Sequence, residues 1–129
     1  MSLRHIRTVA GVGEPVGAFS QAVVANGFVF TSGQIPVTSE GPVEGDFETR
    51  LLATLDNLRA LLEASGSGFD RIVKINGYLT DPEHLETYNR VFHRVFGTAA
   101  LPARTTVGVT LWGVELEIDC VALVGKGSE

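Results

Sequence analysis

The sequence predicts an α+β fold in which two helices cover one face of a mostly antiparallel sheet of about six strands. Two stretches have apolar residues at helical spacing, one following Asp46 and one following Asp81-Pro82. Several short runs rich in β-branched and aromatic residues, separated by turn residues, indicate strands. Because both helices are expected on one face of the sheet, the other, apolar face is left exposed, and we expect self-association to bury it.

The N-terminal third predicts three strands. The first is expected over Leu3–Val9, and the next two over 20–25 and 28–31. Asn26-Gly27 separates the second and third strands and is typical of a tight hairpin, since both turn residues tolerate a positive φ. A polar loop is expected to run from there to Gly45.

The first helix is the most clearly marked element. Asp46 is the expected N-cap, and Ser65-Gly66 is the expected end. The apolar side recurs every three or four residues and comprises Phe47, Leu51, Leu52, Leu55, Leu58, Leu61 and Leu62.

The middle of the chain predicts a strand and a second helix. The strand lies within Phe69–Leu79, and Gly77 inside it suggests a bulge or a close backbone approach. Asp81 and Pro82 are the expected N-cap and first residue of the helix. Its expected buried side consists of Leu85, Tyr88, Phe92, Val95 and Phe96.

The last two strands are predicted to form an apolar hairpin. They are expected over 103–111 and 114–124, with Trp112-Gly113 as a two-residue turn. Trp112 is expected to pack against a neighbour rather than to stand exposed as a lid. Cys120 is expected to be a small buried hydrophobe.

Composition narrows the class of protein. The length of 129 residues predicts one domain over the whole chain, 1–129. An excess of acidic over basic residues, 15 to 10, argues against general nucleic-acid binding. A single cysteine cannot form an internal disulfide and fits a reducing, cytoplasmic location, and we expect no signal peptide and no membrane span. His84 and His93, nine residues apart on one helix, do not have metal-ligand spacing.

Arg104 is the first candidate for a functional residue. It shares one strand face with Thr106, Gly108 and Thr110, which is a small and polar face with one long cation. A guanidinium is always charged, and its planar fork of donors fits a carboxylate. The alternative is a structural ion pair with an acid on the next strand, and the pattern alone slightly favours this alternative.

The following strand offers the acids. Glu115, Glu117 and Asp119 alternate on one face. With the two-residue turn, Gly108 would face Glu117, so Arg104 would lie roughly 13 Å along the hairpin from Glu117. A register shift would bring Glu117 nearer, and spacing therefore leaves open whether Glu117 or Asp119 is the acid that acts with Arg104.

Six segments occur in the order seen in the reactive intermediate deaminase (RidA/YjgF) family, which the chain resembles from about Gly17 to Leu123. The Ser-Gly-Gln-Ile-Pro and Pro-Ala-Arg segments are specific only in combination. The segments are 17–23, 31–36, 56–58, 72–74, 88–89 and 102–104.

The resemblance implies a homotrimer of chorismate-mutase-like subunits whose sheets form a central barrel, with ligand clefts between subunits. It implies hydrolysis of 2-aminoacrylate-type enamines and their imines to 2-keto acids and ammonia, without metal or cofactor. Arg104 would bind the substrate carboxylate, and Glu117 would position or activate water. The remaining implied substrate-binding residues are Phe19, Ser32, Gly33, Asn89 and Thr106.

Three departures from the family pattern bear on activity. Phe19 stands where the family usually has tyrosine, Thr106 stands where cysteine is common, and the last connection is about two residues shorter. The changes at Phe19 and Thr106 suggest an altered substrate range rather than a lost fold, and the shorter last hairpin is what leaves the choice between Glu117 and Asp119 open. The changes at Phe19 and Thr106 also keep open a second function, a trimer that binds small carboxylates without catalysis. A ribonuclease activity is the weakest alternative, given the net acidity.

Overall fold

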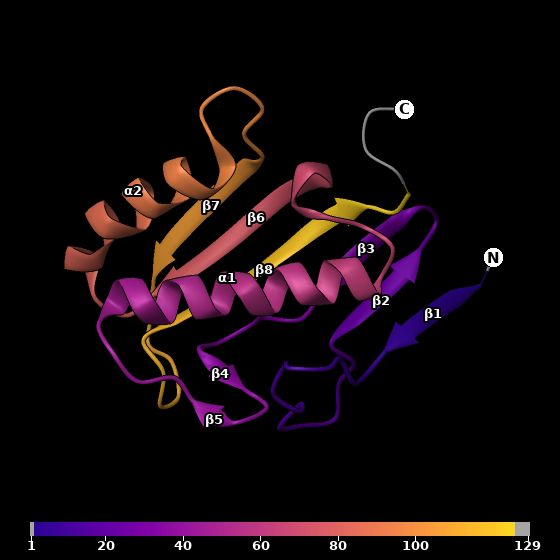
Figure 1. The fold of residues 1–129 in the computed structure, drawn as a ribbon, viewed down its shortest axis with the longest axis horizontal. Helices are drawn as coiled ribbons and strands as arrows, with labels where there is room; N and C mark the ends of the chain where they lie inside the picture. The colour runs from indigo at the N-terminus through magenta and orange to yellow at the C-terminus, as the bar shows by residue number, and fades with distance from the viewer. Residues whose placement is uncertain (1, 126–129) are drawn as a thin grey trace.

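The computed structural model describes residues 2–125, and its centre is a six-stranded sheet with the order β1-β2-β3-β8-β6-β7 (Figure 1). Every neighbouring pair is antiparallel except β6 and β7, which are parallel. The strands are β1 (Leu3–Ile6), β2 (Ala22–Ala25), β3 (Phe28–Thr31), β6 (Ile72–Leu79), β7 (Ala103–Gly108) and β8 (Leu116–Leu123). The first strand is thus shorter than the predicted Leu3–Val9.

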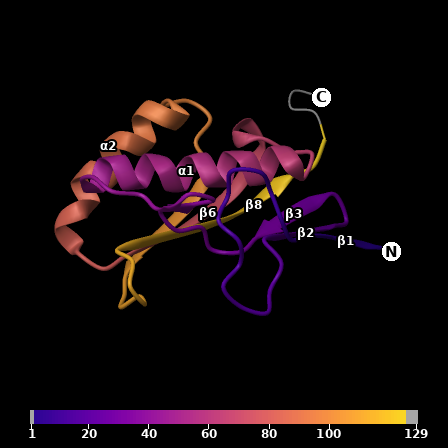
Figure 2. The ribbon, with the colours of Figure 1, turned by 60° about the horizontal axis from the view of Figure 1, so that its bottom comes forward.

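Two helices, α1 (Phe47–Ala64) and α2 (Leu85–Phe96), pack on the same face of this sheet, as predicted (Figures 1 and 2). We call this the helix face and the opposite one the open face. No helix within residues 2–125 has the length and apolar character needed to cross a membrane. The arrangement is the predicted α+β fold with a mixed sheet.

The predicted first helix and its ends are confirmed. The Asp46 carboxylate accepts a hydrogen bond from the Thr49 amide (2.9 Å), and the chain leaves the helix through Gly66 at φ +84°. The predicted hairpin is confirmed as well, since Asn26 and Gly27 join β2 to β3 with φ values of +53° and +82°. In the predicted polar loop, two short strands pair with each other, β4 (Val37–Thr38) and β5 (Gly41–Pro42).

The second helix differs in detail from its prediction. A 3-10 turn over Pro82–His84 precedes α2, and Asp81 caps this turn by accepting from the Glu83 amide (2.9 Å). Leu85, predicted to be buried, is exposed, and Val91 is buried instead. Leu85 is the first residue of α2, so it lies at the end of the helix beside the 3-10 turn, whereas Val91 lies in the middle of the helix.

The predicted hairpin of the last two strands is wrong. Strand β6 lies between β7 and β8, and α2 provides the crossover that joins β6 to its parallel neighbour β7. Residues 109–115 therefore connect two strands that do not pair. Two apolar strands joined by a turn-like segment are typical of a hairpin, and the sequence alone does not show that a third strand lies between them in the sheet.

The pairing with β6 decides which face each side chain of β7 and β8 occupies. Arg104 is level with Ile75, a buried residue of the helix face, whereas Glu117 is level with Tyr78 on the open face. Arg104 and Glu117 therefore lie on opposite faces of the sheet. The predicted hairpin separation of these two residues does not apply.

The open face is rich in exposed apolar side chains. On the helix face, Cys120 is buried as predicted, with only 1% of its surface exposed. On the open face, Phe30, Val107 and Leu123 are each at least 40% exposed, and Val73, at the β-bulge near the start of β6, is equally exposed. Exposed apolar side chains gathered on one sheet face are typical of a surface that binds another protein.

Candidate functional site

The guanidinium of Arg104 is held by α2 and has no acidic partner within residues 2–125. Its Nη2 donates to the Asn89 side-chain oxygen (2.6 Å). Its central carbon lies 5.3 Å from the ring centroids of both Tyr88 and Phe92, in range of a cation–π interaction. The ion pairs of the described chain do not include Arg104, so the predicted alternative of a structural ion pair is wrong.

A hollow of about 350 Å³ opens beside this arginine, and we call it the arginine hollow. Its lining combines the cation and an amide with apolar groups: Asn89, Phe92, His93, Leu101, Pro102 and Arg104. A guanidinium with unused donors in such a hollow can bind a carboxylate.

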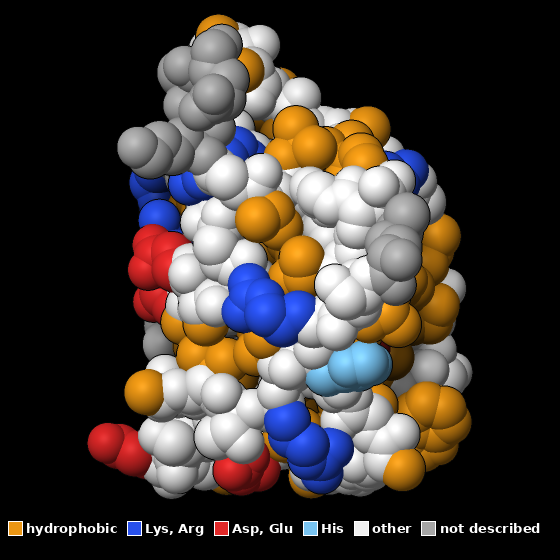
Figure 3. Space-filling model, turned by 90° about the vertical axis from the view of Figure 1, so that its right-hand side faces the viewer, with side chains coloured by type: hydrophobic (Ala, Val, Ile, Leu, Met, Phe, Trp, Pro, Cys, Tyr) orange, Lys and Arg blue, Asp and Glu red, His pale blue; other side chains and the backbone are white. Residues whose placement is uncertain are grey.

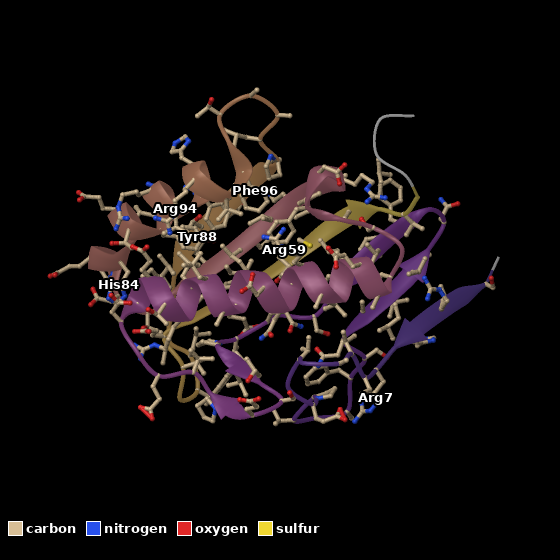
Figure 4. All side chains as sticks on the ribbon, in the orientation of Figure 1. Arg7, Arg59, His84, Tyr88, Arg94 and Phe96 are labelled. Atoms are coloured by element: carbon tan, nitrogen blue, oxygen red, sulfur yellow. The ribbon has the colours of Figure 1, made fainter. Side chains whose placement is uncertain are left out.

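Tyr88 lies on α2, and its side chain is buried beside the Arg104 guanidinium (Figure 4). Its hydroxyl lies over Gly77, where a Cβ would come within 2.0 Å of it, so the predicted close approach at Gly77 is confirmed. The hydroxyl oxygens of Tyr88 and Thr106 are both buried, and neither has a hydrogen-bond partner among the described residues. Burial raises the pKa of Tyr88 to about 12, against the opposing effects of the Arg104 charge and the Thr106 hydroxyl. Tyr88 is therefore a neutral support for the guanidinium.

Glu117 borders a second hollow, of about 430 Å³, which we call the glutamate hollow. Its polar lining residues are Ser32, Gly33 and Glu117. The other five are apolar and comprise Val16, Phe19, Ile35, Trp112 and Val114. The hollow therefore offers one ionisable group in an apolar setting.

The glutamate carboxylate lies directly against the backbone of Gly33. A Cβ built on Gly33 would be 1.9 Å from Glu117 Oε2, so this position accommodates Glu117 only because it is glycine. Hydrogen bonds between the backbones of Gln34 and Ile118 hold the segment against β8 (2.7 and 3.0 Å). The Ser32 hydroxyl points back to its own chain and donates to the Ser20 carbonyl (2.6 Å).

The two candidate acids have different environments. Asp119 accepts hydrogen bonds from the Asn76 amide (2.7 Å) and the Tyr78 hydroxyl (3.0 Å). The Glu117 carboxylate has no such partner within residues 2–125. Burial, followed by the nearby charge of Asp119, raises the pKa of Glu117 above the ordinary glutamate value.

The structure thus divides the predicted site residues into two groups. Phe19, Ser32, Gly33 and Glu117 line one hollow, and Arg104 and Asn89 line the other. Thr106 lies on the helix face two residues beyond Arg104 and borders a third, small hollow. Within the described chain, no group of three His, Cys, Asp or Glu residues is placed to hold a metal ion.

Sequence reasoning missed three residues that shape these environments. Phe92 was predicted only as core, yet its ring also faces the guanidinium. Asn76 and Tyr78 bind Asp119 from the neighbouring strand. Their alternation with Ile75, Gly77 and Leu79 could have indicated that Asn76 and Tyr78 share the open face, but the partner strand was not predictable from it.

Known proteins resemble this chain over nearly its whole length. The family model described as Endoribonuclease L-PSP matches residues 12–124. A RutC family protein of Synechocystis is 38% identical and covers 96% of this chain and 98% of its own. A Rid family protein of Yersinia pestis has a solved structure with a TM-score of 0.88 at 31% identity, covering 95% of this chain and all of that one. The structure of E. coli TdcF with bound serine has a TM-score of 0.84 at 32% identity and covers 93% and 98%.

The matched region includes Arg104, Glu117 and both hollows, and the architecture agrees with the chorismate-mutase-like fold of these proteins. On this basis the chain belongs to the endoribonuclease L-PSP family, which is the RidA/YjgF family indicated by its sequence motifs.

Proposed function

We propose that this protein hydrolyses reactive enamines and imines of short 2-amino acids to 2-keto acids and ammonia. The observation that carries the proposal is Arg104, a guanidinium with no acidic partner in the described chain, held by Asn89 beside an open hollow. A 2-imino acid has a carboxylate next to its reacting carbon. Binding that carboxylate to Arg104 fixes the position of the carbon that water attacks.

We further propose that the working unit is a homotrimer. Arg104 and Glu117 lie on opposite faces of one sheet, so a single subunit does not supply both groups to one small substrate. Packing of the apolar open faces against one another would bury Phe30, Val107 and Leu123 and bring the glutamate hollow of one copy to the arginine hollow of the next. Each cleft would then combine Arg104 and Asn89 from one subunit with Glu117, Gly33, Ser32 and Phe19 from its neighbour.

The chemistry needs few groups. A proton from solvent adds to the enamine carbon and gives the iminium, and water then adds to the C=N carbon. Glu117 accepts a proton from this water as its oxygen bonds to carbon, which gives a carbinolamine, and the same proton is returned to the carbinolamine nitrogen. The hydroxyl group then gives its proton to Glu117 as the C=O bond forms and the C–N bond breaks, so that ammonia leaves, the 2-keto acid is the other product, and Glu117 passes the proton to solvent. The raised pKa of Glu117 makes its carboxylate a stronger proton acceptor than an ordinary glutamate.

Two observations support Glu117 over Asp119 in this role. Asp119 already accepts hydrogen bonds from Asn76 and Tyr78, whereas Glu117 borders the hollow with a free carboxylate. The Thr106 hydroxyl is buried and borders a hollow separate from the other two, so in this scheme Thr106 does not contact the substrate.

A binding role without catalysis is the second candidate, favoured by the serine bound to TdcF. Such a protein would bind the ligand carboxylate with Arg104, and Glu117 would not take part in proton transfer. The charge of the chain does not support a ribonuclease, because RNA-binding proteins usually carry basic surfaces and this chain has a net charge of -5. The side shown in Figure 3 has basic side chains dispersed among apolar and neutral groups.

The test is the hydrolysis of an imine generated in situ. An amino acid oxidase supplies 2-iminopropanoate, semicarbazide traps what remains, and the trapped product is followed by absorbance with wild type, Arg104→Ala and Glu117→Gln. We expect hydrolysis above the buffer rate and losses of about 10- to 100-fold in kcat/KM for Arg104→Ala, the size of a charge-assisted hydrogen bond.

A matched control separates this loss from the general removal of a surface guanidinium. Arg59 also lies over an aromatic ring, that of Phe69 at 4.3 Å, but it borders neither hollow. Arg59→Ala is expected to keep wild-type kcat/KM. A wild type that does not exceed the buffer rate while still binding 2-keto acids through Arg104 would refute the deaminase and support the binding role.

A further inference from the structure

We propose that Trp112, together with Phe19 and Val16, selects substrates with a large apolar side chain, such as the 2-imino acids derived from leucine and phenylalanine. This selectivity rests on the deaminase function proposed above. Its basis is the wall of the glutamate hollow rather than the groups that react.

The glutamate hollow is larger and more apolar than a three-carbon imino acid requires. Such a substrate carries one methyl or methylene group besides its carboxylate and imine. The hollow measures about 430 Å³, and five of its eight lining residues are apolar. Among its eight lining residues, Glu117 is the one charged group. The Ser32 hydroxyl already donates a hydrogen bond to the Ser20 carbonyl. A small substrate would leave the apolar wall in contact with water, whereas a leucine- or phenylalanine-derived substrate would cover it.

Trp112 lies on an anchored connection, and within the described chain its side chain is exposed rather than packed against a neighbour as expected from the sequence. It lies in the connection from β7 to β8, and both ends of that connection are hydrogen-bonded at the end of β6. The Val109 amide donates to the Leu79 carbonyl (2.9 Å), and the Thr80 amide donates to the Glu115 carbonyl (3.1 Å). Between these points Trp112 is 94% exposed and contributes to the glutamate hollow. A large aromatic group displayed on an anchored connection is available for contact with a bound ligand.

The opposite part of the wall comes from the loop before β2. The Phe19 ring lies against Gly17, where a Cβ would come within 3.2 Å of it, and the Phe19 amide donates to the Gly17 carbonyl (3.0 Å). Phenylalanine at this position offers the hollow an apolar ring without a hydroxyl. Val16, from the same loop, is 91% exposed and also borders the hollow. Both ends of the wall thus present apolar surface to the same space.

The experiment compares three imino acids, generated by an amino acid oxidase from alanine, leucine and phenylalanine. The kcat/KM ratio of the leucine- and phenylalanine-derived substrates to the alanine-derived one is measured for wild type and Trp112→Ala. The matched control is Leu3→Ala, which removes another exposed apolar side chain (58% exposed) outside both hollows. We expect a wild-type ratio of about 10 or more, since one methylene in an apolar pocket changes kcat/KM by about that factor. Trp112→Ala is expected to lower the ratio by about 10-fold, and Leu3→Ala to leave it unchanged.

The outcomes separate this selectivity from the deaminase function. A wild type that hydrolyses all three imines equally, or the alanine-derived imine fastest, overturns the selectivity and leaves the deaminase standing. A wild type inactive on every imine overturns both. Equal losses on all three substrates with Trp112→Ala, accompanied by a smaller oligomer in size-exclusion chromatography, would assign Trp112 to subunit packing and overturn the selectivity. Phe19→Tyr restores a hydroxyl to the wall and is expected to lower the same ratio without changing the oligomer.

Discussion

Placing Arg104 and Glu117 on opposite faces of one sheet predicts that two impaired variants restore each other's activity in the proposed trimer. The perturbation is co-assembly of Arg104→Ala subunits with Glu117→Gln subunits in equal amounts. Each variant alone has one defect in every cleft of the proposed trimer. In a mixed trimer, a cleft is intact when its arginine comes from a Glu117→Gln subunit and its glutamate from an Arg104→Ala subunit.

The expected recovery follows from the symmetry of a closed ring. With random mixing, the arginine donor is correct in half of the clefts and the glutamate donor in half, independently, so about a quarter of all clefts are intact, which is about one cleft in three within the trimers that contain both variants. If one subunit supplied both groups to its own cleft, every cleft would have a defect, and no activity would return. Opposite faces of a sheet do not allow that second arrangement without a rearrangement of β6 and β7.

The assay uses two affinity tags, one on each variant, and sequential purification to isolate mixed oligomers. Hydrolysis of 2-iminopropanoate above the buffer rate is then compared with wild type and with each variant alone. Isolated mixed oligomers that remain as inactive as the single variants would refute a cleft shared between subunits. A wild type that sediments as a monomer at working concentration would refute the trimer itself.

The remaining predictions concern two close contacts and one carboxyl group. Gly33→Ala and Gly77→Ala form a matched pair. The methyl group of Gly33→Ala meets the movable end of the Glu117 side chain, so we expect activity to fall while thermal stability is kept. The methyl group of Gly77→Ala meets the buried Tyr88 hydroxyl, so we expect a loss of about 1–3 kcal/mol in the free energy of unfolding. The opposite ranking in denaturant titrations would contradict the geometry at both glycines. Because burial and Asp119 raise the pKa of Glu117, kcat/KM should fall as the pH drops through that raised value, and Asp119→Asn should move the acid limb to lower pH. A carboxyl whose pKa is raised by folding favours the folded state most at low pH and loses this contribution as the pH rises. Glu117→Gln should therefore abolish the fall of kcat/KM at low pH and should be at least as stable as wild type at pH 7. A marked loss of stability in this variant would show that the ionised carboxylate supports the fold.

Much of the fold was predictable because its signals are local. Asp46 and Gly66 mark the ends of α1 through capping and a positive φ, and Asn26-Gly27 defines the β2–β3 hairpin by the same conformational preference. The helix count correctly predicted one covered and one uncovered face. Leu85 was misplaced because its spacing matches the buried side of α2, and spacing alone does not show how far the first residue of a helix is covered.

The candidate site was predictable only in its parts. Arg104, Glu117, Gly33 and Asn89 were identified from motifs, and each borders a hollow of the structure. The position of these residues relative to one another was not predictable, because the pairing of strands that are distant in the chain leaves little trace in a single sequence. Inserting β6 between β7 and β8 changed the partner of Arg104 from an acid across a hairpin to Asn89 on α2.

By itself, the sequence determined the α+β class, the ends of α1, the hairpin at Asn26-Gly27 and the candidate residues of the functional site. These depend on the conformational and chemical preferences of short segments. The tertiary structure alone decided that Arg104 has an amide rather than a carboxylate as its partner, that Glu117 occupies the other face of the sheet, and that Trp112 borders the same hollow as Glu117. These depend on which strands become neighbours, and that is set by the packing of the whole chain.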